Sequence, residues 1–257
     1  MSGAALVVRQ LRFTNKAFWR NPAAAFFTFA FPLLFLIIFT TLFGSAEIVI
    51  NGNTVSVATF YIAGIAAFSV ITACYTNIAM SLTFARDLGV LKRVKGTPLP
   101  GWAYLTARML HAVAIGLLLV LICLVFGMLF YEARLPASSI PAFVVTLALG
   151  AACFAALGMA ITTVVPNADA APAIVNASIL PLLFISDVFI PLQDPPAWLD
   201  VLGKVFPVRH FSEAMQHVFF PPAGAAGFQP ASLAVLVAWG ALGLLVAVRR
   251  FSWEPRR

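Results

Sequence analysis

Long apolar runs separated by short polar connections dominate this chain. Six of them approach or exceed the ~20 residues that a helix needs to cross a hydrocarbon core of ~30 Å. They cover residues 23–43, 57–82, 103–130, 141–165, 170–190 and 230–248, and we number them as spans 1 to 6. Because backbone groups in lipid cannot bond to water, each run is predicted to be helical. The pattern predicts an all-α polytopic membrane protein with six transmembrane helices.

The composition supports a membrane protein as well. The 257 residues are 62% hydrophobic and 10% charged, whereas soluble domains carry about 25% charged residues. A soluble globule of this length could not hide so much apolar surface. Since the runs follow one another with short connections, we expect one membrane domain over residues 23–257, preceded by a separate helix within residues 1–22.

Residues 6–21 alternate apolar side chains with cations, which predicts an amphipathic helix lying in the membrane interface. The alternative is a simple flank that follows the positive-inside rule. A cleaved secretory signal is not favoured, because the apolar run that follows is too long and bulky. The cations of this helix are Arg9, Arg12, Lys16 and Arg20.

Residues 84–100, the charged segment, form the only long charged stretch inside the apolar chain. They lie between spans 2 and 3, carry four cations and one acid, and have the spacing of a short amphipathic helix. The chain has no Gly-x-x-x-x-Gly-Lys-Ser/Thr phosphate loop. We therefore interpret the charged segment as a docking element for a soluble partner rather than as a ligand site.

The positions of the cations predict the orientation. Twelve of the sixteen Lys and Arg residues lie before span 1, in the charged segment, or after span 6. By the positive-inside rule, both termini and the charged segment are cytoplasmic. The net charge of +7 follows from these topology signals and does not indicate nucleic-acid binding. Nucleic acid is therefore not an expected partner. The cations that follow span 6 are Arg249, Arg250, Arg256 and Arg257. Arg134, Lys204 and Arg209 fall on the other side, and Arg108 lies just inside span 3, near its inner end.

Polar side chains within two spans predict a translocation path. Ser69, Thr72 and Thr76 share one face of span 2. Polar groups at this depth usually face the bundle interior or a water-filled cavity, although hydrogen bonding between helices is the alternative. Asn176 and Asp187 of the proline-containing span 5 complete the set. For Asp187, which is near the membrane edge, simple hydration is the alternative interpretation.

Span 4 has a face of small residues that permits another helix to approach closely, either within the bundle or from a second copy. Alanines recur there at a strict spacing of four, and two glycines form a neighbouring stripe. These residues are Ala148, Ala152, Ala156, Ala160, Gly150 and Gly158.

Two segments outside the spans have structure of their own. Residues 44–56 contain an Asn51-Gly52-Asn53 turn signal, which predicts a small hairpin. Residues 191–229 contain two apolar stripes of helical spacing separated by Pro207, which predict a pair of short amphipathic helices at the outer surface. We expect this pair to act as an outer gate through Trp198, Leu202, Phe206, Phe211 and Met215.

No pattern of catalytic or metal-binding residues is evident. The chain lacks a His-Glu-x-x-His pair and a Gly-x-Ser-x-Gly elbow, and its three cysteines stand singly within apolar runs. An intramembrane enzyme acting on lipid through His111 or Asp187 would need acid, base or metal partners that cannot be assembled. We expect no metal, no cofactor and no enzymatic activity in this chain itself.

Three motifs resemble the permease subunits of ABC-2 type exporters, nearest to the daunorubicin-resistance-like drug exporter group. The first is the charged segment from Arg86 to Pro100, with its acid-basic-Gly stretch, Leu-Lys-Arg and Gly-Thr-Pro-Leu. The second covers residues 184–192, and the third covers residues 196–199 and 206–211. Relatives often carry glycine where this chain has Asp187. The similarity extends through nearly the whole length.

This resemblance implies a half-transporter in the bacterial cytoplasmic membrane. Two permease chains, identical or close paralogues, would pair and bind two copies of a separate ATPase subunit, which holds ATP and Mg. The charged segment would hold a coupling helix that sits in a groove of the ATPase, and the cargo would be a hydrophobic or amphiphilic drug-like compound or lipid. The implied coupling residues are Arg86, Asp87, Leu88, Gly89, Leu91, Lys92, Arg93, Lys95 and Gly96.

Two other functions fit the sequence less well. An exporter of lipid-linked glycan or another cell-envelope precursor belongs to the same family, but no aromatic-rich glycan channel is evident in the sequence. A passive channel or ion-coupled carrier is disfavoured because charged residues are nearly absent from the centres of the spans. The identity of the cargo is left open.

Overall fold

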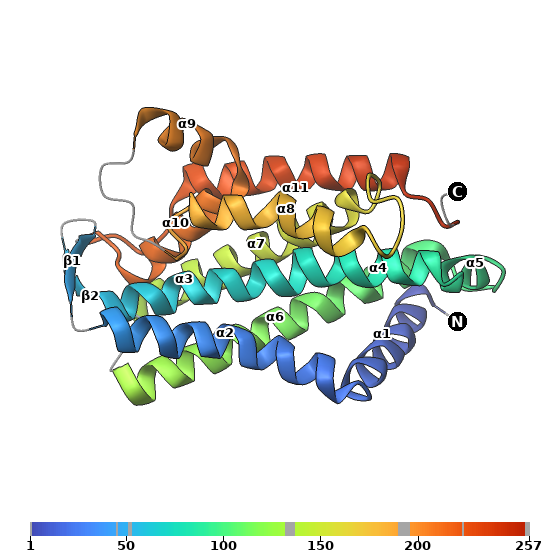
Figure 1. Ribbon diagram of the computed structural model, residues 1–257, viewed down its shortest axis with the longest axis horizontal. Coiled ribbons are helices and arrows are strands. Elements are labelled where there is room, and N and C mark those ends of the chain that lie inside the picture. Colours follow the sequence, from blue (N-terminus) through green and yellow to red (C-terminus); the bar gives the residue numbers. More distant parts are fainter. Residues whose placement is uncertain are drawn as a thin grey trace.

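The computed structural model describes residues 2–44, 46–50, 53–131, 137–189, 196–222 and 224–254. The chain is built almost entirely from helices (Figure 1). In the first half these are α1 (Gly3–Trp19), α2 (Pro22–Phe43), α3 (Val57–Ile71), the π-helical turn η1 (Thr72–Thr76), α4 (Asn77–Asp87), α5 (Val90–Lys95) and α6 (Gly101–Tyr131). In the second half they are the 3₁₀ turn η2 (Ala137–Ser139), α7 (Ile140–Ile161), α8 (Ala171–Phe184), α9 (Ala197–Val205), α10 (Pro207–Phe219) and α11 (Pro230–Arg250).

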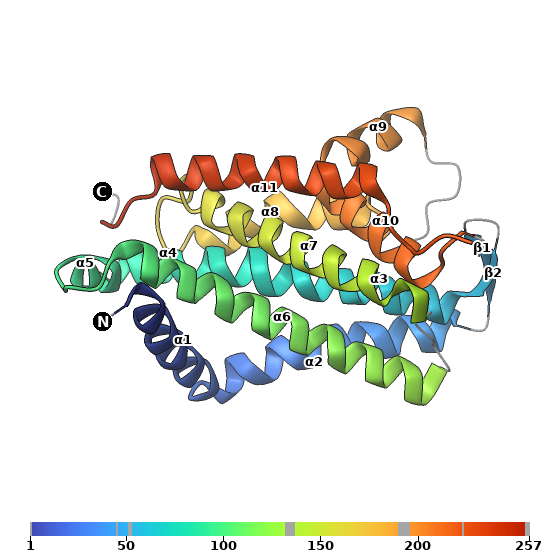
Figure 2. The same cartoon turned by 180° about the vertical axis from the view of Figure 1, so that it is seen from behind.

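The long helices form an elongated bundle with two distinct ends. One end carries α5 and both ends of the chain, and we call it the α5 end (Figures 1 and 2). The opposite end carries the strands β1 (Glu47–Ile50) and β2 (Asn53–Ser56), and we call it the hairpin end. The two strands pair antiparallel, with Glu47 opposite Ser56, which confirms the predicted hairpin. Its Asn51-Gly52 turn lies outside the described residues, as do Arg134, Arg256 and Arg257.

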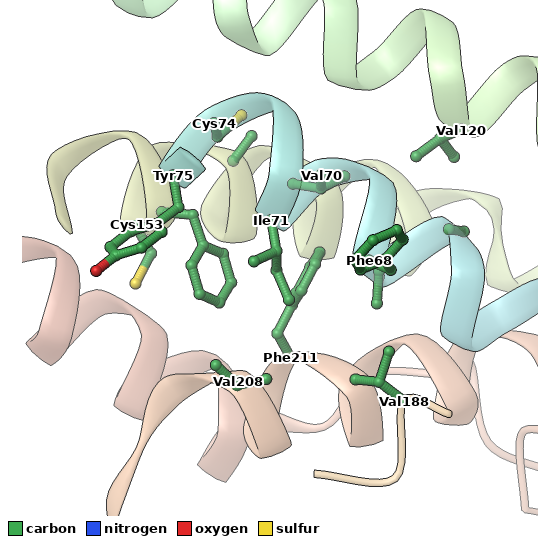
Figure 3. Close-up of a cluster of buried hydrophobic side chains, with 14 of the residues drawn as sticks. Phe68, Val70, Ile71, Cys74, Tyr75, Val120, Cys153, Val188, Val208 and Phe211 are labelled. Carbon is green, nitrogen blue, oxygen red and sulfur yellow. The ribbon is translucent and has the colours of Figure 1, made fainter. Parts of the chain in front are cut away.

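A continuous central helix made of α3, η1 and α4 runs through the bundle. In the most apolar 18-residue stretch of this helix, 89% of the residues are buried. The corresponding share is 17% in α2 and 22% in α11. The central helix carries polar side chains such as Ser69, Thr76 and Asn77, which favour contact with other helices, whereas α2 and α11 leave broad apolar faces for lipid. Figure 3 shows Val208 and Phe211 of α10 on one side of the central helix and Val120 of α6 on the other. The surrounding helices are therefore organised around this element.

Aromatic rings join α2 to the central helix and to the segment that follows α8. Phe39 stacks on Tyr61 with ring centroids 5.0 Å apart. Phe189 lies against both Phe35 and Phe68, at 5.6 and 5.2 Å. Contacts between aromatic rings add to the area that they bury. The hairpin-end halves of α2, α3 and the segment after α8 are thus packed together.

The small residues of span 4 act mainly inside the bundle. A Cβ at Gly150 would lie 2.2 Å from the ring of Phe211, and one at Gly243 of α11 would lie 3.1 Å from the backbone carbon of Ala156. A Cβ at Gly158 would meet the carbonyl oxygens of Tyr75 and Cys74 at 2.7 and 2.9 Å. The glycines therefore let α7 approach the central helix, α10 and α11 closely, whereas Ala148 and Ala152 are exposed.

Among the described residues, five helices are long and apolar enough to cross a membrane, and they correspond to predicted spans 1, 2, 3, 4 and 6. The polytopic all-α prediction is confirmed. Predicted span 5 differs, because α8 has 14 residues and is only ~21 Å long. After α8 the chain turns at Asp187, whose φ of 54° is incompatible with a continuing right-handed helix. The six predicted spans thus correspond to five long spans and one short apolar helix.

We predict that Gly158→Ala destabilises the bundle by about 1–3 kcal/mol, the usual effect of overpacking a close contact. The added methyl would press on backbone carbonyls of the central helix, which cannot rotate away as a side chain can. The matched control is Gly116→Ala in α6, where a Cβ lies at an ordinary 3.5 Å from Ala73. Thermal unfolding of the two purified variants measures the difference. Equal melting temperatures would contradict the proposed role of Gly158.

Candidate functional site

The charged segment is a tight helical hairpin at the α5 end of the central helix. Helix α4 ends at Asp87, and Gly89 adopts the left-handed conformation with φ of 70°, which favours glycine. This conformation reverses the chain so that α5 begins directly at Val90. The predicted amphipathic helix is therefore present, although it has only six residues.

Arg86 ties the charged segment to the turn between α7 and α8. Its side chain is 2% exposed, and its guanidinium donates to the carbonyl oxygens of Thr162, Val165 and Pro166 at 2.9, 2.6 and 3.1 Å. These carbonyls follow the end of α7, where intrahelical donors run out. A buried guanidinium has several donors and so satisfies several of these acceptors at once.

Asp87 makes a second connection to the same turn. Its carboxylate oxygen Oδ2 accepts a hydrogen bond from the backbone N–H of Ala168 at 2.7 Å. Charge-assisted bonds of this kind are stronger than bonds between neutral groups. Arg86 and Asp87 thus hold the end of α4 to the α7–α8 turn, and neither is placed on the outer surface of the charged segment as a free side chain.

The outer surface of the charged segment combines apolar and cationic side chains. Leu88 is 71% exposed, and Val90, Lys92 and Arg93 are also exposed. Leu91, in contrast, is fully buried in the core of the bundle. The predicted coupling residues therefore separate into an inward anchoring set and an outward-facing set. Lys95, at the end of α5, lies 3.4 Å from the exposed carboxylate of Glu254, and Gly96 is exposed beside it.

Of the predicted path residues, only Thr72 and Thr76 line a common cavity. It has a volume of about 330 Å³ and lies between α2, η1 and α6. In η1 the N–H of Asn77 bonds to the carbonyl of Thr72, five residues back. One extra residue in a helical turn rotates the following side chains by about 100° relative to those before it. This π-helical turn separates Thr76 from the face on which Ser69 lies.

The other path residues are placed apart from this cavity. Ser69 is fully buried and lies 3.8 Å from the Sγ atom of Cys123 in α6. Asn176 is on an exposed face of α8, and Asp187 lies after α8, 3.9 Å from Arg209 of α10. Ser178, which was not among the predicted residues, bonds to the hydroxyl of Tyr75 at 2.6 Å. This contact links α8 to the central helix.

A network of charges around Arg209 joins the segment after α8 to α9 and α10. The buried guanidinium lies 2.9 Å from Asp200, 3.0 Å from Glu213 and 3.9 Å from Asp187. The sequence marks Asp187 as unusual but does not reveal this partner, since the two residues are far apart in the chain. The sequence does indicate the contact between Arg209 and Glu213, because residues four positions apart are neighbours on a helix. Hydrogen bonding from Lys204 lowers the pKa of Asp200 from its usual value.

The predicted outer-gate residues belong to two different environments. Trp198 and Leu202 of α9 are exposed, whereas Phe211 and Met215 of α10 are fully buried. Phe206, between the helices, stacks on Trp239 of α11 at 5.9 Å. Helix α10 is therefore part of the core, and only α9 presents a free apolar face. Within the described residues, no group of three or more His, Cys, Asp or Glu side chains has a geometry suited to a metal ion.

Comparison with known proteins places this architecture in a family. Residues 5–220 match the family described as ABC-2 type transporter. A protein named transport permease ycf38 from Porphyra purpurea is 24% identical over 202 residues, which cover 78% of this chain and 69% of that protein. Its counterpart in Pyropia yezoensis is 24% identical over 223 residues, covering 86% of this chain and 75% of that protein.

A further relative is a protein named multidrug ABC transporter permease YbhR, from Escherichia coli K12. It is 24% identical over 157 residues, which cover 60% of this chain and 42% of that protein. The family match covers most of the chain, including the charged segment, α8 and α10. The resemblance of the motifs is thereby confirmed at the level of the family. This chain belongs to the ABC-2 type transporter family of membrane permeases.

Proposed function

We propose that this chain is the membrane subunit of an ATP-driven exporter that moves hydrophobic or amphiphilic compounds, drug-like or lipid, out of the cytoplasm or the inner leaflet. A separate ATPase subunit, which holds ATP and Mg, supplies the energy. The observation that carries the proposal is the charged segment, because Leu88 is exposed there while Arg86 and Asp87 tie it to the α7–α8 turn. A push on α5 is transmitted into the bundle, since packed helices move as units.

The proposed orientation rests on the distribution of cations. The exposed cations of α1, α5 and the end of α11 all belong to elements that reach the α5 end (Figure 1). Positive charge near membrane helices marks the cytoplasmic side. We therefore assign the α5 end to the cytoplasm, with both termini on that side, in the cytoplasmic membrane of a bacterium.

The proposed assembly contains two permease chains, identical or paralogous, and two ATPase subunits. Asn176 supports the pairing, because it is exposed on α8, a helix of apolar composition that would otherwise face lipid. An amide in hydrocarbon is costly unless it finds a partner. Leu180 and Phe184 continue the same exposed face of α8. We assign this face to contact with the second chain.

The direct test is reconstitution of the permease with a candidate ATPase subunit, sought first in the adjacent reading frames. Vesicles would receive a fluorescent hydrophobic dye in one series and a fluorescent phospholipid in another. ATP-dependent movement of either probe is expected, and replacing the phosphate-loop lysine of the ATPase should abolish it. Movement that persists without the ATPase, or an ATPase that never associates with the permease, would contradict the proposal.

Leu88→Asp is expected to weaken ATPase association by about tenfold, because an exposed apolar contact becomes a charge that must be desolvated at the interface. Leu88→Met preserves the apolar contact and should bind normally. The thermal stability of both variants should equal that of the wild type, since the side chain is 71% exposed. Co-purification and binding assays measure the effect. Wild-type affinity in Leu88→Asp would remove Leu88 from the docking surface.

Asp87→Ala is expected to leave ATPase binding intact and to reduce export. The change removes the bond to the N–H of Ala168 and so loosens the connection between the charged segment and the α7–α8 turn. Its cost to stability should be about 1.5–3 kcal/mol, as for a hydrogen bond to a charged group. Asp169→Ala, an exposed acid in the same turn, is the matched control. Equal export by the two variants at equal ATPase binding would show that this connection does not transmit motion.

A further inference from the structure

A second cavity, partly polar, lies at the α5 end between α1, the start of α2, α4 and α6. Its volume is about 250 Å³. Figure 2 shows α1 and α2 meeting at an open angle beside α6. Among the described residues that line this cavity there are two basic side chains and no carboxylate. The lining residues that bear polar groups are Thr14, Asn21, Asn77, Ser81, Arg108 and His111.

The two basic side chains of this cavity have unused hydrogen-bonding capacity. Arg108 donates to the hydroxyl of Tyr104 at 2.9 Å, and its buried Nε atom makes no hydrogen bond. His111 is 7% exposed, and its buried Nε2 atom also makes none. Buried polar groups without partners are unfavourable, and a guanidinium at membrane depth requires compensation. A ligand that accepts hydrogen bonds and carries negative charge would give these groups hydrogen-bond partners and would compensate the charge of the guanidinium.

The first, apolar cavity adjoins this polar one. Phe18, Ala24 and Asn77 line both cavities, so the two share walls. From there the apolar cavity extends along α2, η1 and α6 past Phe31 and Leu119. Phe18 makes an edge contact with the imidazole of His111, with ring centroids 5.4 Å apart, and thereby stands at the boundary. A basic compartment is thus followed, towards the membrane centre, by an apolar one.

We propose that these joined cavities bind a phosphate-bearing lipid of the inner leaflet, with its phosphate at Arg108 and His111 and an acyl chain in the apolar cavity. The assignment to the inner leaflet rests on the proposed function and its orientation. Arginine is well suited to phosphate because its several donors match the phosphate oxygens. A soluble phosphate compound would fill only the polar half. The site thus narrows the cargo class to anionic amphiphiles.

The location explains why the ligand is a lipid rather than a solute. Arg108 lies about two turns inside α6, a membrane-spanning helix, and α1 packs across that part of α6 through Val7. Because α1 is amphipathic and carries its cations outward, its level corresponds to the headgroup region. A lipid headgroup is therefore at the right depth, and its chains extend towards η1.

The test measures lipid binding to the purified permease alone, without the ATPase. Delipidated protein in detergent is titrated with phosphatidylglycerol or with diacylglycerol of the same chains, and bound lipid is counted by native mass spectrometry. The wild type should prefer phosphatidylglycerol. Arg108→Gln should weaken that binding about tenfold, as expected for loss of a charge-assisted contact, and leave the binding of diacylglycerol, which has no phosphate, unchanged. Arg250→Gln removes an exposed cation from the same end and should have no effect.

The apolar half is tested by Ala24→Trp, which places a large ring where the two cavities meet. Because Ala24 is exposed, the fold should tolerate the substitution. The binding of both lipids should become weaker. Glycerol phosphate in excess should not displace phosphatidylglycerol. Displacement by glycerol phosphate, or equal weakening by Arg108→Gln and Arg250→Gln, would overturn the proposal in favour of a plain anion site or general surface attraction.

A measurement on the wild type covers the case in which Arg108→Gln does not fold. A phosphatidylglycerol with a photoreactive acyl chain should crosslink to peptides that contain Phe18, Phe31 or Leu119. Crosslinks confined to other helices would overturn the site.

Failure of ATP-driven movement together with Arg108-dependent lipid binding would count against the exporter and not against the lipid site. ATP-driven export together with lipid binding that does not depend on Arg108 would count against the lipid site and not against the exporter.

Discussion

The architecture depends on close packing around a central helix that is buried on nearly every side and carries polar side chains at several levels. The helix formed by α3, η1 and α4 is the most deeply buried of the long helices described, and α2, α6, α7 and α10 pack around it. Enclosure requires close approach, which Gly158 permits by leaving room beside the carbonyls of η1. In a membrane, where lipid is as apolar as the side chains, such close packing is a main source of helix association.

Polar contacts of different kinds hold the segments around this helix together. At the α5 end, Arg86 and Asp87 bind the backbone of the α7–α8 turn and hold the charged segment to the bundle. On the α10 side of the bundle, Arg209 lies close to carboxylates from the segment after α8, from α9 and from α10. Within the central helix, the π-helical turn redirects Thr76 and Asn77 towards the cavities beside α2. The central helix is thus held to neighbouring helices at several levels along its length.

The fold was more predictable than the site. Hydrophobic runs identify membrane helices because the length of a span is set by the bilayer. The same criterion overestimated the length of span 5, because three of residues 185–189 are apolar although the backbone turns there. Within the charged segment, spacing indicated a helix but did not distinguish exposed Leu88 from buried Leu91. Arg86 was expected to contact a partner, and its burial against three carbonyls depends on residues about eighty positions later.

The amino-acid sequence by itself determined the membrane character, the position of the charged segment and the family resemblance, because these follow from local composition, helical period and short motifs. Only the tertiary structure decided which polar residues meet. Ser69, Thr72 and Thr76 share a face in a regular helix, but the π-helical turn separates Ser69 from Thr76, which lines a cavity together with Thr72. Arg108 and His111 became a basic cavity only when α1 and α2 covered them. Helical period places side chains on faces, but what each face meets is set by the packing of distant helices.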